Sequence, residues 1–411
     1  MKTKVSKIFS CFGYELGIFI VFCVQAFLNR EMIINMENDF YSYYLIDYSM
    51  GINARMLVGS VVNLLTDNPT AAWLKGFMIA VLVLSMLGVA ILIGQVIRNV
   101  KEEYKKSLFV FVLFFVFGTF TMYGFSRYFG LLDVHMFIVA LVSIICLQNK
   151  YLRWFVPLLS VVGVMVYFSY IYAFFIAVIG AAFYYAVNRK EDKSYLIIFL
   201  LSAILCVAAT AYCAFEAPDH MFVTFEEMWN IMEQKSGIKF EYEELRPFEL
   251  FYYRSASDEG TGYSFSNMTT AEMLNLVIMA ILGQIPEFRT VNYDGIISLV
   301  AIFAVIAAGF LTVWILCIKN SETKLQKFVF ACFILAMLVI PVSWLISTDY
   351  SRMVQTGVLN QFVFVFFMFA AKDKAFEKAI DTLKSFFKNK EILLVIYFLI
   401  CASCFQKGWT V

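Results

Sequence analysis

Charged residues are scarce in this sequence. Asp, Glu, Lys and Arg make up only 15% of the 411 residues, whereas hydrophobic residues make up 62%. A soluble globular protein carries about 25% charged residues, so this composition excludes that class. It predicts an all-α polytopic membrane protein.

A disulfide framework is also lacking. All nine cysteines lie in or beside apolar runs, where thiols behave as small hydrophobic side chains. Cys401 and Cys404 form a CxxC pattern without a second pair, which favours helix packing over metal or redox chemistry. No small-residue cleavage site follows the first apolar run, so we expect a retained helix there.

Long apolar runs predict about eleven transmembrane helices in a single membrane-embedded domain, residues 1–411, because about 20 apolar residues cross ~30 Å of hydrocarbon. We expect these helices near residues 8–28, 73–97, 107–123, 133–148, 154–168, 170–187, 194–214, 294–318, 327–346, 355–371 and 391–407. The apolar stretch from 154 to 187 is too long for one crossing, so two short helices turning near Ser169 are expected. Whether residues 271–286 also cross stays open.

Basic residues divide unequally between the two faces. With the N terminus inside, the inner segments hold 21 of the 32 Lys and Arg residues, as the positive-inside rule requires. Seven of the eleven outer basic residues are arginine, whose planar fork suits phosphate or carboxylate. The sequence therefore predicts a working surface on the outer face. For any single outer arginine, the alternative is that it only forms ion pairs with the acidic residues around it, and this alternative is as well supported as ligand binding.

Three segments outside the spans have distinctive sequences. The first outer loop, residues 29–72, contains MLVGSVVNLL at 56–65, which is too short to cross and is expected to lie on the membrane surface or tuck in partway. The largest outer loop, residues 215–293, is acidic and contains EEMWNIMEQ, which indicates a helix. Residues 372–390 contain AFEKAIDTLKSFFK, whose apolar face predicts an amphipathic helix on the inner surface.

Candidate functional residues gather where the outer ends of the helices are expected. The candidate catalytic residues are Asp47, Asp39, Glu37 and His135, the candidate phosphate-binding residues are Arg55, Arg127 and Arg352, and the supporting acids are Asp133 and Asp349. Carboxylates in such places act as general bases or bind a divalent cation such as Mg²⁺ or Mn²⁺. The alternatives are ordinary helix caps and loop charges for the acids, and a packed polar residue for His135.

The stretch YYLIDYSMGINARMLVG, residues 43–59, holds two of these candidates. Gly51 and Asn53 interrupt any continuous helix, so we expect Asp47 and Arg55 on either side of a bend, pointing toward a common cleft. We expect Asp47 to act on the acceptor, as a base or through a metal, and Arg55 to steady a departing phosphate. Asp39 is the alternative base.

The topology and the stretch MENDFYSYYLIDYSMGINARMLVGSVVNLL, residues 36–65, resemble class C membrane glycosyltransferases, in particular bacterial O-antigen glucosyltransferases. The resemblance implies a donor sugar linked to polyprenyl phosphate, a glycan or lipid acceptor, and chemistry at the outer face of the bacterial cytoplasmic membrane. Asp39 or Asp47 then takes the position of the acidic catalytic element, and Arg55 lies near the donor phosphate. The acidic element here is not a DD or DxD, so the choice between the two acids stays open.

Two further functions are considered beside the glycosyltransferase. A polysaccharide repeat-unit polymerase uses the same kind of substrate, and a carrier or flippase would move lipid-linked sugars or small solutes. A carrier usually has two related halves and ionisable groups near mid-membrane. The only acid or base well inside a predicted span is Glu15, near the inner end of the first one. The sequence therefore favours an enzyme in the lipid bilayer, and no nucleic acid is expected as a partner.

Overall fold

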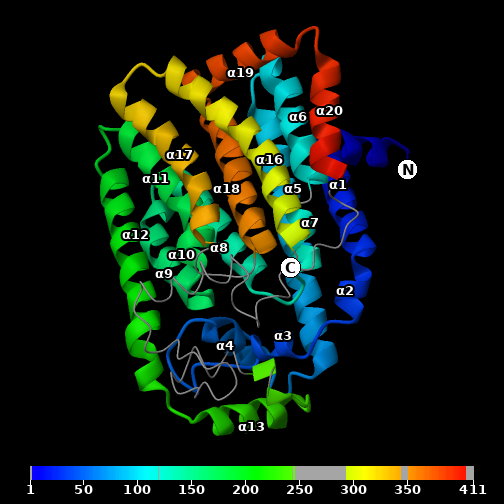
Figure 1. Ribbon diagram of the computed structural model, residues 1–411, viewed down its shortest axis with the longest axis vertical. Coiled ribbons are helices and arrows are strands. Elements are labelled where there is room, and N and C mark those ends of the chain that lie inside the picture. Colours follow the sequence, from blue (N-terminus) through cyan, green and yellow to red (C-terminus); the bar gives the residue numbers. More distant parts are fainter. Residues whose placement is uncertain (1, 119, 243, 246–292, 344–349, 404–411) are drawn as a thin grey trace.

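The chain folds into a bundle of helices (Figure 1). The computed structural model describes residues 2–118, 120–242, 244–245, 293–343 and 350–403, and within these ranges there are helices and no β-strand. The bundle helices are α1 (Lys2–Leu28), α5 (Ala71–Asn99), α6 (Glu102–Phe117), α8 (Asp133–Gln148), α9 (Val156–Val166), α11 (Phe175–Asn188), α12 (Ser194–Ala211), α16 (Tyr293–Asn320), α17 (Lys324–Ser343), α18 (Tyr350–Ala371) and α20 (Glu391–Ser403).

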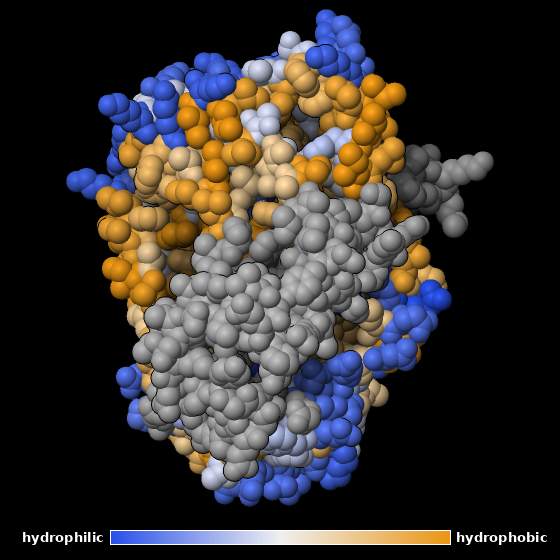
Figure 2. Space-filling model, in the orientation of Figure 1, coloured by the Kyte–Doolittle hydropathy of each residue, from blue (hydrophilic) through white to orange (hydrophobic). Residues whose placement is uncertain are grey.

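Several of these helices are suited to a bilayer. Among the described residues, five helices are long and apolar enough to cross a membrane: Ala71–Asn99, Glu102–Arg127, Ser194–Glu216, Phe303–Asn320 and Ser351–Ala371. Figure 2 shows apolar side chains along the flanks of the bundle and polar side chains gathered at its two ends. These features indicate an α-helical membrane protein, while the number of eleven crossings stays a prediction.

The break expected near Ser169 is present. Helix α9 ends at Val166, the one-turn helix α10 (Tyr170–Ala173) follows, and α11 begins at Phe175. A Cβ atom added to Gly163 would lie 2.3 Å from the Tyr170 ring, so the glycine lets α10 fold back against α9. The turn leaves Tyr167 and Phe168 outside any helix, where their rings can face neighbouring elements.

Short helices collect at one end of the bundle, called here the α13 end. Figure 1 shows α3 (Asp39–Ser42), α4 (Met56–Leu65) and α13 (Phe225–Ser236) there, with α19 (Lys374–Phe387) at the opposite, α19 end. The helix expected from EEMWNIMEQ is confirmed as α13, which begins with a capping box between Thr224 and Glu227. Two further short helices are α2 (Arg30–Ile34) and α7 (Met122–Arg127). Residues 271–286 lie outside the described part of the chain.

Helix α19 packs on the protein through its apolar face. Ala379 and Ile380 are buried, and the Phe376 ring packs against the rings of Phe369 (4.8 Å between centroids) and Trp314 (6.2 Å). The helix begins with Asp373 as its N-cap, which accepts a hydrogen bond from the backbone N–H of Phe376. Its position relative to a membrane surface stays a prediction.

Helix α18 runs through the interior of the bundle and carries uncharged polar side chains, none of which is among the candidates predicted from the sequence. Gln355, Thr356, Asn360 and Gln361 are all buried. Gln361 accepts a hydrogen bond from the Trp314 indole (2.6 Å) and donates one to the Phe333 carbonyl (3.0 Å). Buried polar groups in a membrane protein are costly unless hydrogen-bonded, so these bonds tie α18 to its neighbours.

Candidate functional site

The candidate site begins with the segment that joins α3 to α4. Its residues from Ile46 to Arg55 are not helical, as expected from Gly51 and Asn53. Arg55 has a φ angle of 72°, a left-handed conformation that is uncommon outside glycine. Its backbone N–H donates a hydrogen bond to the carbonyl of Met165 (3.0 Å) at the end of α9. Arg55 is thereby held at the junction of α4 and α9.

The Arg55 side chain is buried among aromatic rings, with 3% of the residue exposed. Its Nη2 donates a hydrogen bond to the hydroxyl of Tyr167 (2.8 Å). The guanidinium carbon lies 4.4 Å from the centroid of the Tyr167 ring and 5.3 Å from that of Tyr43. Such cation–π contacts strengthen when water is excluded.

A second arginine reaches the same ring from α18. The guanidinium carbon of Arg352 lies 5.7 Å from the centroid of the Tyr167 ring. Its Nε lies 2.9 Å from the carboxylate of Asp133, the first residue of α8. Both residues of this ion pair are buried, and the N-terminus of a helix favours a carboxylate. The fold therefore brings Arg55, Arg352 and Asp133 together.

The phenol of Tyr43 belongs to this cluster, because its ring faces the Arg55 guanidinium. Burial raises the pKa of the Tyr43 phenol, the positive charges of Arg55 and Arg352 lower it, and the charge of Asp39 raises it. The charges of Arg55, Arg352 and Asp39 therefore all affect the pKa of the Tyr43 phenol. We call the group formed by Tyr43, Arg55, Tyr167, Asp133 and Arg352 the arginine cluster.

Asp39 has the properties of a proton acceptor. Burial raises the pKa of its carboxyl to about 6, the charges of Glu37 and Glu244 add to this effect, and the backbone N–H of Phe40 opposes it. Its Oδ1 is buried and has no hydrogen-bond partner among the described residues. A general base works best when its pKa is near the operating pH. Glu37, by contrast, is exposed to solvent.

Asp47 is engaged in a different contact from the one expected. Its carboxylate lies 2.6 Å from the Nζ of Lys235 on α13 and accepts a hydrogen bond from the backbone N–H of Ser49 (2.8 Å). Burial alone would raise the pKa of this carboxyl, but the bonds from Lys235 and Ser49 outweigh it and lower the pKa. Asp47 and Arg55 thus contact different groups, and Asp47 is the weaker base of the two aspartates.

The structure describes two of the three remaining candidates, Arg127 and His135. The Arg127 guanidinium carbon, at the end of α7, lies 5.7 Å from the centroid of the Tyr128 ring. The His135 ring packs against the Tyr44 ring (5.7 Å), and neither of its nitrogens has a hydrogen-bond partner among the described residues. This environment is that of a packed histidine. Asp349 lies outside the described residues.

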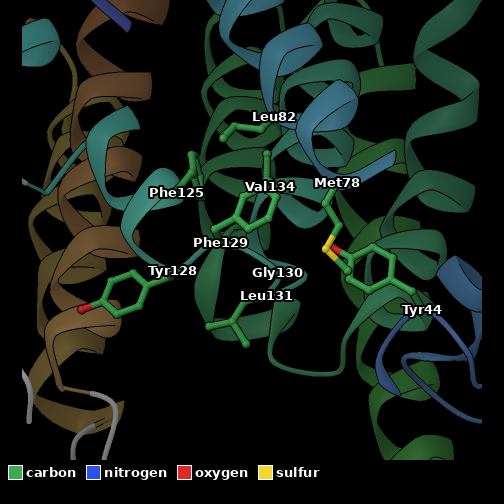
Figure 3. A pocket seen from close by; sticks show the side chains of 9 residues that line it. All are labelled: Tyr44, Met78, Leu82, Phe125, Tyr128, Phe129, Gly130, Leu131 and Val134. Atoms are coloured by element: carbon green, nitrogen blue, oxygen red, sulfur yellow. The ribbon is translucent and has the colours of Figure 1, made fainter. Parts of the chain in front are cut away.

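A small cavity lies between α5, α7 and α8. Figure 3 shows the side chains around it, which include Met78 and Leu82 of α5, Phe125 of α7 and Val134 of α8. Its volume of about 10 Å³ gives room for roughly one water molecule. It is too small for a sugar ring. No group of three or more His, Cys, Asp or Glu side chains able to hold a metal ion occurs among the described residues.

Comparison with known proteins adds no family to this picture. No family model matches the chain, and neither the curated proteins nor the solved structures contain a significant match.

Two residues of the site were not singled out from the sequence. Tyr167 was counted as part of an apolar span, and its role depends on the turn between α9 and α10. Lys235 is one of the outer basic residues that are not arginine, and its contact with Asp47 joins residues 188 positions apart.

Proposed function

We propose that this protein is a membrane glycosyltransferase that moves a sugar from a polyprenyl-phosphate-linked donor to a glycan or lipid acceptor. The observation that supports it best is the convergence of Arg55 and Arg352 on the Tyr167 ring. Two guanidinium forks in a buried site suit the oxygens of a phosphate group. A phosphate attached to a lipid reaches such a site from the bilayer around the bundle.

In this proposal Asp39 is the general base. Its carboxylate takes the proton from an acceptor hydroxyl while the hydroxyl oxygen forms a bond to the anomeric carbon of the donor sugar. The bond between that carbon and the phosphate oxygen breaks, and its electron pair stays on the polyprenyl phosphate. Arg55 and Arg352 stabilise the negative charge that develops there, which is a large contribution in a site with little water.

The same proposal places the α13 end on the extracytoplasmic face of a bacterial cytoplasmic membrane, with the N terminus in the cytoplasm. The distribution of basic residues supports this orientation. A single cysteine at Glu226 of α13, in a variant without the nine native cysteines, should react with an impermeant thiol reagent added to intact cells. A cysteine at Glu322, between α16 and α17, should not, and the reverse pattern would overturn the orientation.

The function is tested by binding and by transfer. Purified protein should bind polyprenyl phosphate, and it should release polyprenyl phosphate from a polyprenyl-phosphate-linked glucose when a glycan acceptor is added. Binding of polyprenyl phosphate does not depend on the identity of the sugar or of the acceptor. Equal binding by the wild type and by an Arg55→Met, Arg352→Met double variant would rule out the arginine cluster as the phosphate site.

Two alternatives use related substrates. A repeat-unit polymerase would require the same phosphate site and would differ in the acceptor that supports turnover. A carrier is favoured by one observation, the buried amides of α18, because polar groups inside a membrane bundle often line a transport path. A carrier should move a lipid-linked sugar across the bilayer of a reconstituted vesicle without any acceptor, whereas the proposed transferase should not.

A further inference from the structure

Helix α13 is bonded to the segment that carries Arg55 of the arginine cluster. The carboxylate of Asp47 is 2.6 Å from the Nζ of Lys235, and the backbone N–H of Phe222 donates to the carbonyl of Met50 (2.9 Å). The side-chain amide of Asn38 donates to the carbonyl of Lys239 (3.3 Å). The chain on both sides of α13 is therefore bonded to the first loop.

Among these contacts only the ion pair joins two charged side chains, and it is well shielded. The Asp47 side chain is 3% exposed and that of Lys235 is 25% exposed. Removing one partner of a buried ion pair leaves an uncompensated charge and is much more harmful than removing both. Lys235 therefore balances the buried charge at the start of the segment from Asp47 to Arg55.

That segment has little freedom to change shape without moving Arg55. It enters α4 through the left-handed conformation of Arg55, and a Cβ atom added to Gly59 of α4 would lie 1.8 Å from the carbonyl oxygen of Ile46. Helix α4 therefore packs directly on the backbone at the start of the segment. A shift of Asp47 would be passed on to α4 and to the Arg55 guanidinium.

We propose that Lys235 is a positioning residue. Its ion pair with Asp47 joins α13 to the segment that ends at Arg55, and this connection, called here the strap, holds Arg55 against Tyr167. The strap rests on the proposed function, because the arginine cluster is taken as the phosphate site. Lys235 itself touches neither donor nor acceptor in this proposal. It acts through Asp47 on the geometry of the site.

The strap is tested first without any assay of activity. Met50 is fully buried in the segment, so a Met50→Cys thiol in an otherwise cysteine-free chain should react slowly with a thiol reagent. Lys235→Met should raise the labelling rate at least about tenfold. The buried Asp47 carboxylate would then lack its counter-charge, so the segment should open more often to let water reach it. Adding Asp47→Asn to Lys235→Met should return most of the protection, because the buried charge is then gone.

A matched control lies four residues along the chain. Lys239 also forms an ion pair, with Glu233 of α13, but its side chain is 84% exposed, and exposed pairs contribute little. Lys239→Met should leave the labelling rate unchanged. An unchanged rate in Lys235→Met, or an equal rise in Lys239→Met, would overturn the strap.

Activity then separates positioning from catalysis. Lys235→Met should raise the KM for a polyprenyl-phosphate-linked glucose more than it lowers kcat, and Lys235→Arg should restore most of the lost activity. The Asp47→Asn, Lys235→Met double variant should be more active than Lys235→Met alone. A double variant without turnover but with wild-type labelling would overturn the proposal and make Asp47 a catalytic residue. If labelling follows expectation while the wild type transfers no sugar, the strap stands and the proposed function fails.

Discussion

The two ends of the bundle use charged side chains in opposite ways. At the α19 end the ion pairs are separate, and each joins two neighbouring elements: Lys101 pairs with Glu377 (2.6 Å) and Arg153 with Asp192 (2.6 Å). At the α13 end Arg55 and Arg352 come from distant parts of the chain and meet at the ring of Tyr167. Separate pairs hold helices together, whereas Arg55, Arg352 and Asp133 form one connected group around a single ring.

The ends also differ in how carboxylates are engaged. Asp381 accepts a hydrogen bond from Tyr104 (3.0 Å) and Asp373 accepts one from Tyr184 (2.8 Å), so both fix α19 to the bundle. Asp39 has one buried carboxylate oxygen without a hydrogen-bond partner in the described ranges, and its pKa is raised to about 6. An oxygen in that state is free to accept a proton, as the proposed role of general base requires.

The largest expected effect separates Asp39 from the carboxylates of the α19 end. Asp39→Asn removes the proposed general base, so the rate of sugar transfer should fall about 100- to 10,000-fold with little change in the amount of folded protein. Asp381→Asn should transfer sugar at nearly the wild-type rate. Transfer rates are measured by release of polyprenyl phosphate. Normal transfer by Asp39→Asn would remove Asp39 from the mechanism and return the role of base to Asp47.

The next effect separates arginines by their environment. Arg55→Lys and Arg352→Lys keep the charge but lose the planar fork, and losing a charge-assisted hydrogen bond of about 1.5–3 kcal/mol lowers transfer roughly 10- to 100-fold. Arg153→Lys, in the ion pair with Asp192, should affect stability and not transfer per folded molecule. If all three lysine variants transfer sugar equally well, Arg55 and Arg352 do not differ in role from Arg153.

A smaller effect is expected from pH. A base must be deprotonated to act, and an aspartate with its ordinary pKa of about 3.9 would remain active down to about pH 4. Because the pKa of Asp39 is raised to about 6, kcat/KM should decline as the pH falls through about 6. Asp47 has a lowered pKa and cannot produce this decline. A profile that stays flat down to pH 5 would exclude Asp39 as the base.

Many helices of the bundle could be predicted from the sequence, because a long apolar run indicates a helix. The break near Ser169 and the helix α13 followed from local patterns of length, charge and capping, and both are present. The count of crossings was less accessible, because several helices of 10 to 17 residues are shorter than a bilayer requires. Composition alone does not tell a short crossing from a helix buried in protein.

The site was accessible only in part, for a different physical reason. Arg55, Arg352 and Asp133 were predicted as candidates because charged residues are scarce in this chain. Ionisable residues in membrane segments are costly and are often functional. The partners of these residues depend on contacts between distant segments, and spacing along the chain does not encode them. The choice between Asp47 and Asp39 therefore stayed open, and nothing local indicated that Lys235 would reach Asp47.

The smallest effect concerns the ion pair that marks the α19 end. Lys101 is about half exposed and pairs with Glu377 of α19, and an exposed pair contributes little to stability. Lys101→Met should therefore lower the thermal midpoint only slightly and leave both polyprenyl phosphate binding and sugar transfer intact. The apolar contact of Phe376 with Trp314 continues to hold α19 in place. A marked loss of binding in Lys101→Met would mean that the two ends are coupled, and that the charges of the α19 end do more than join helices.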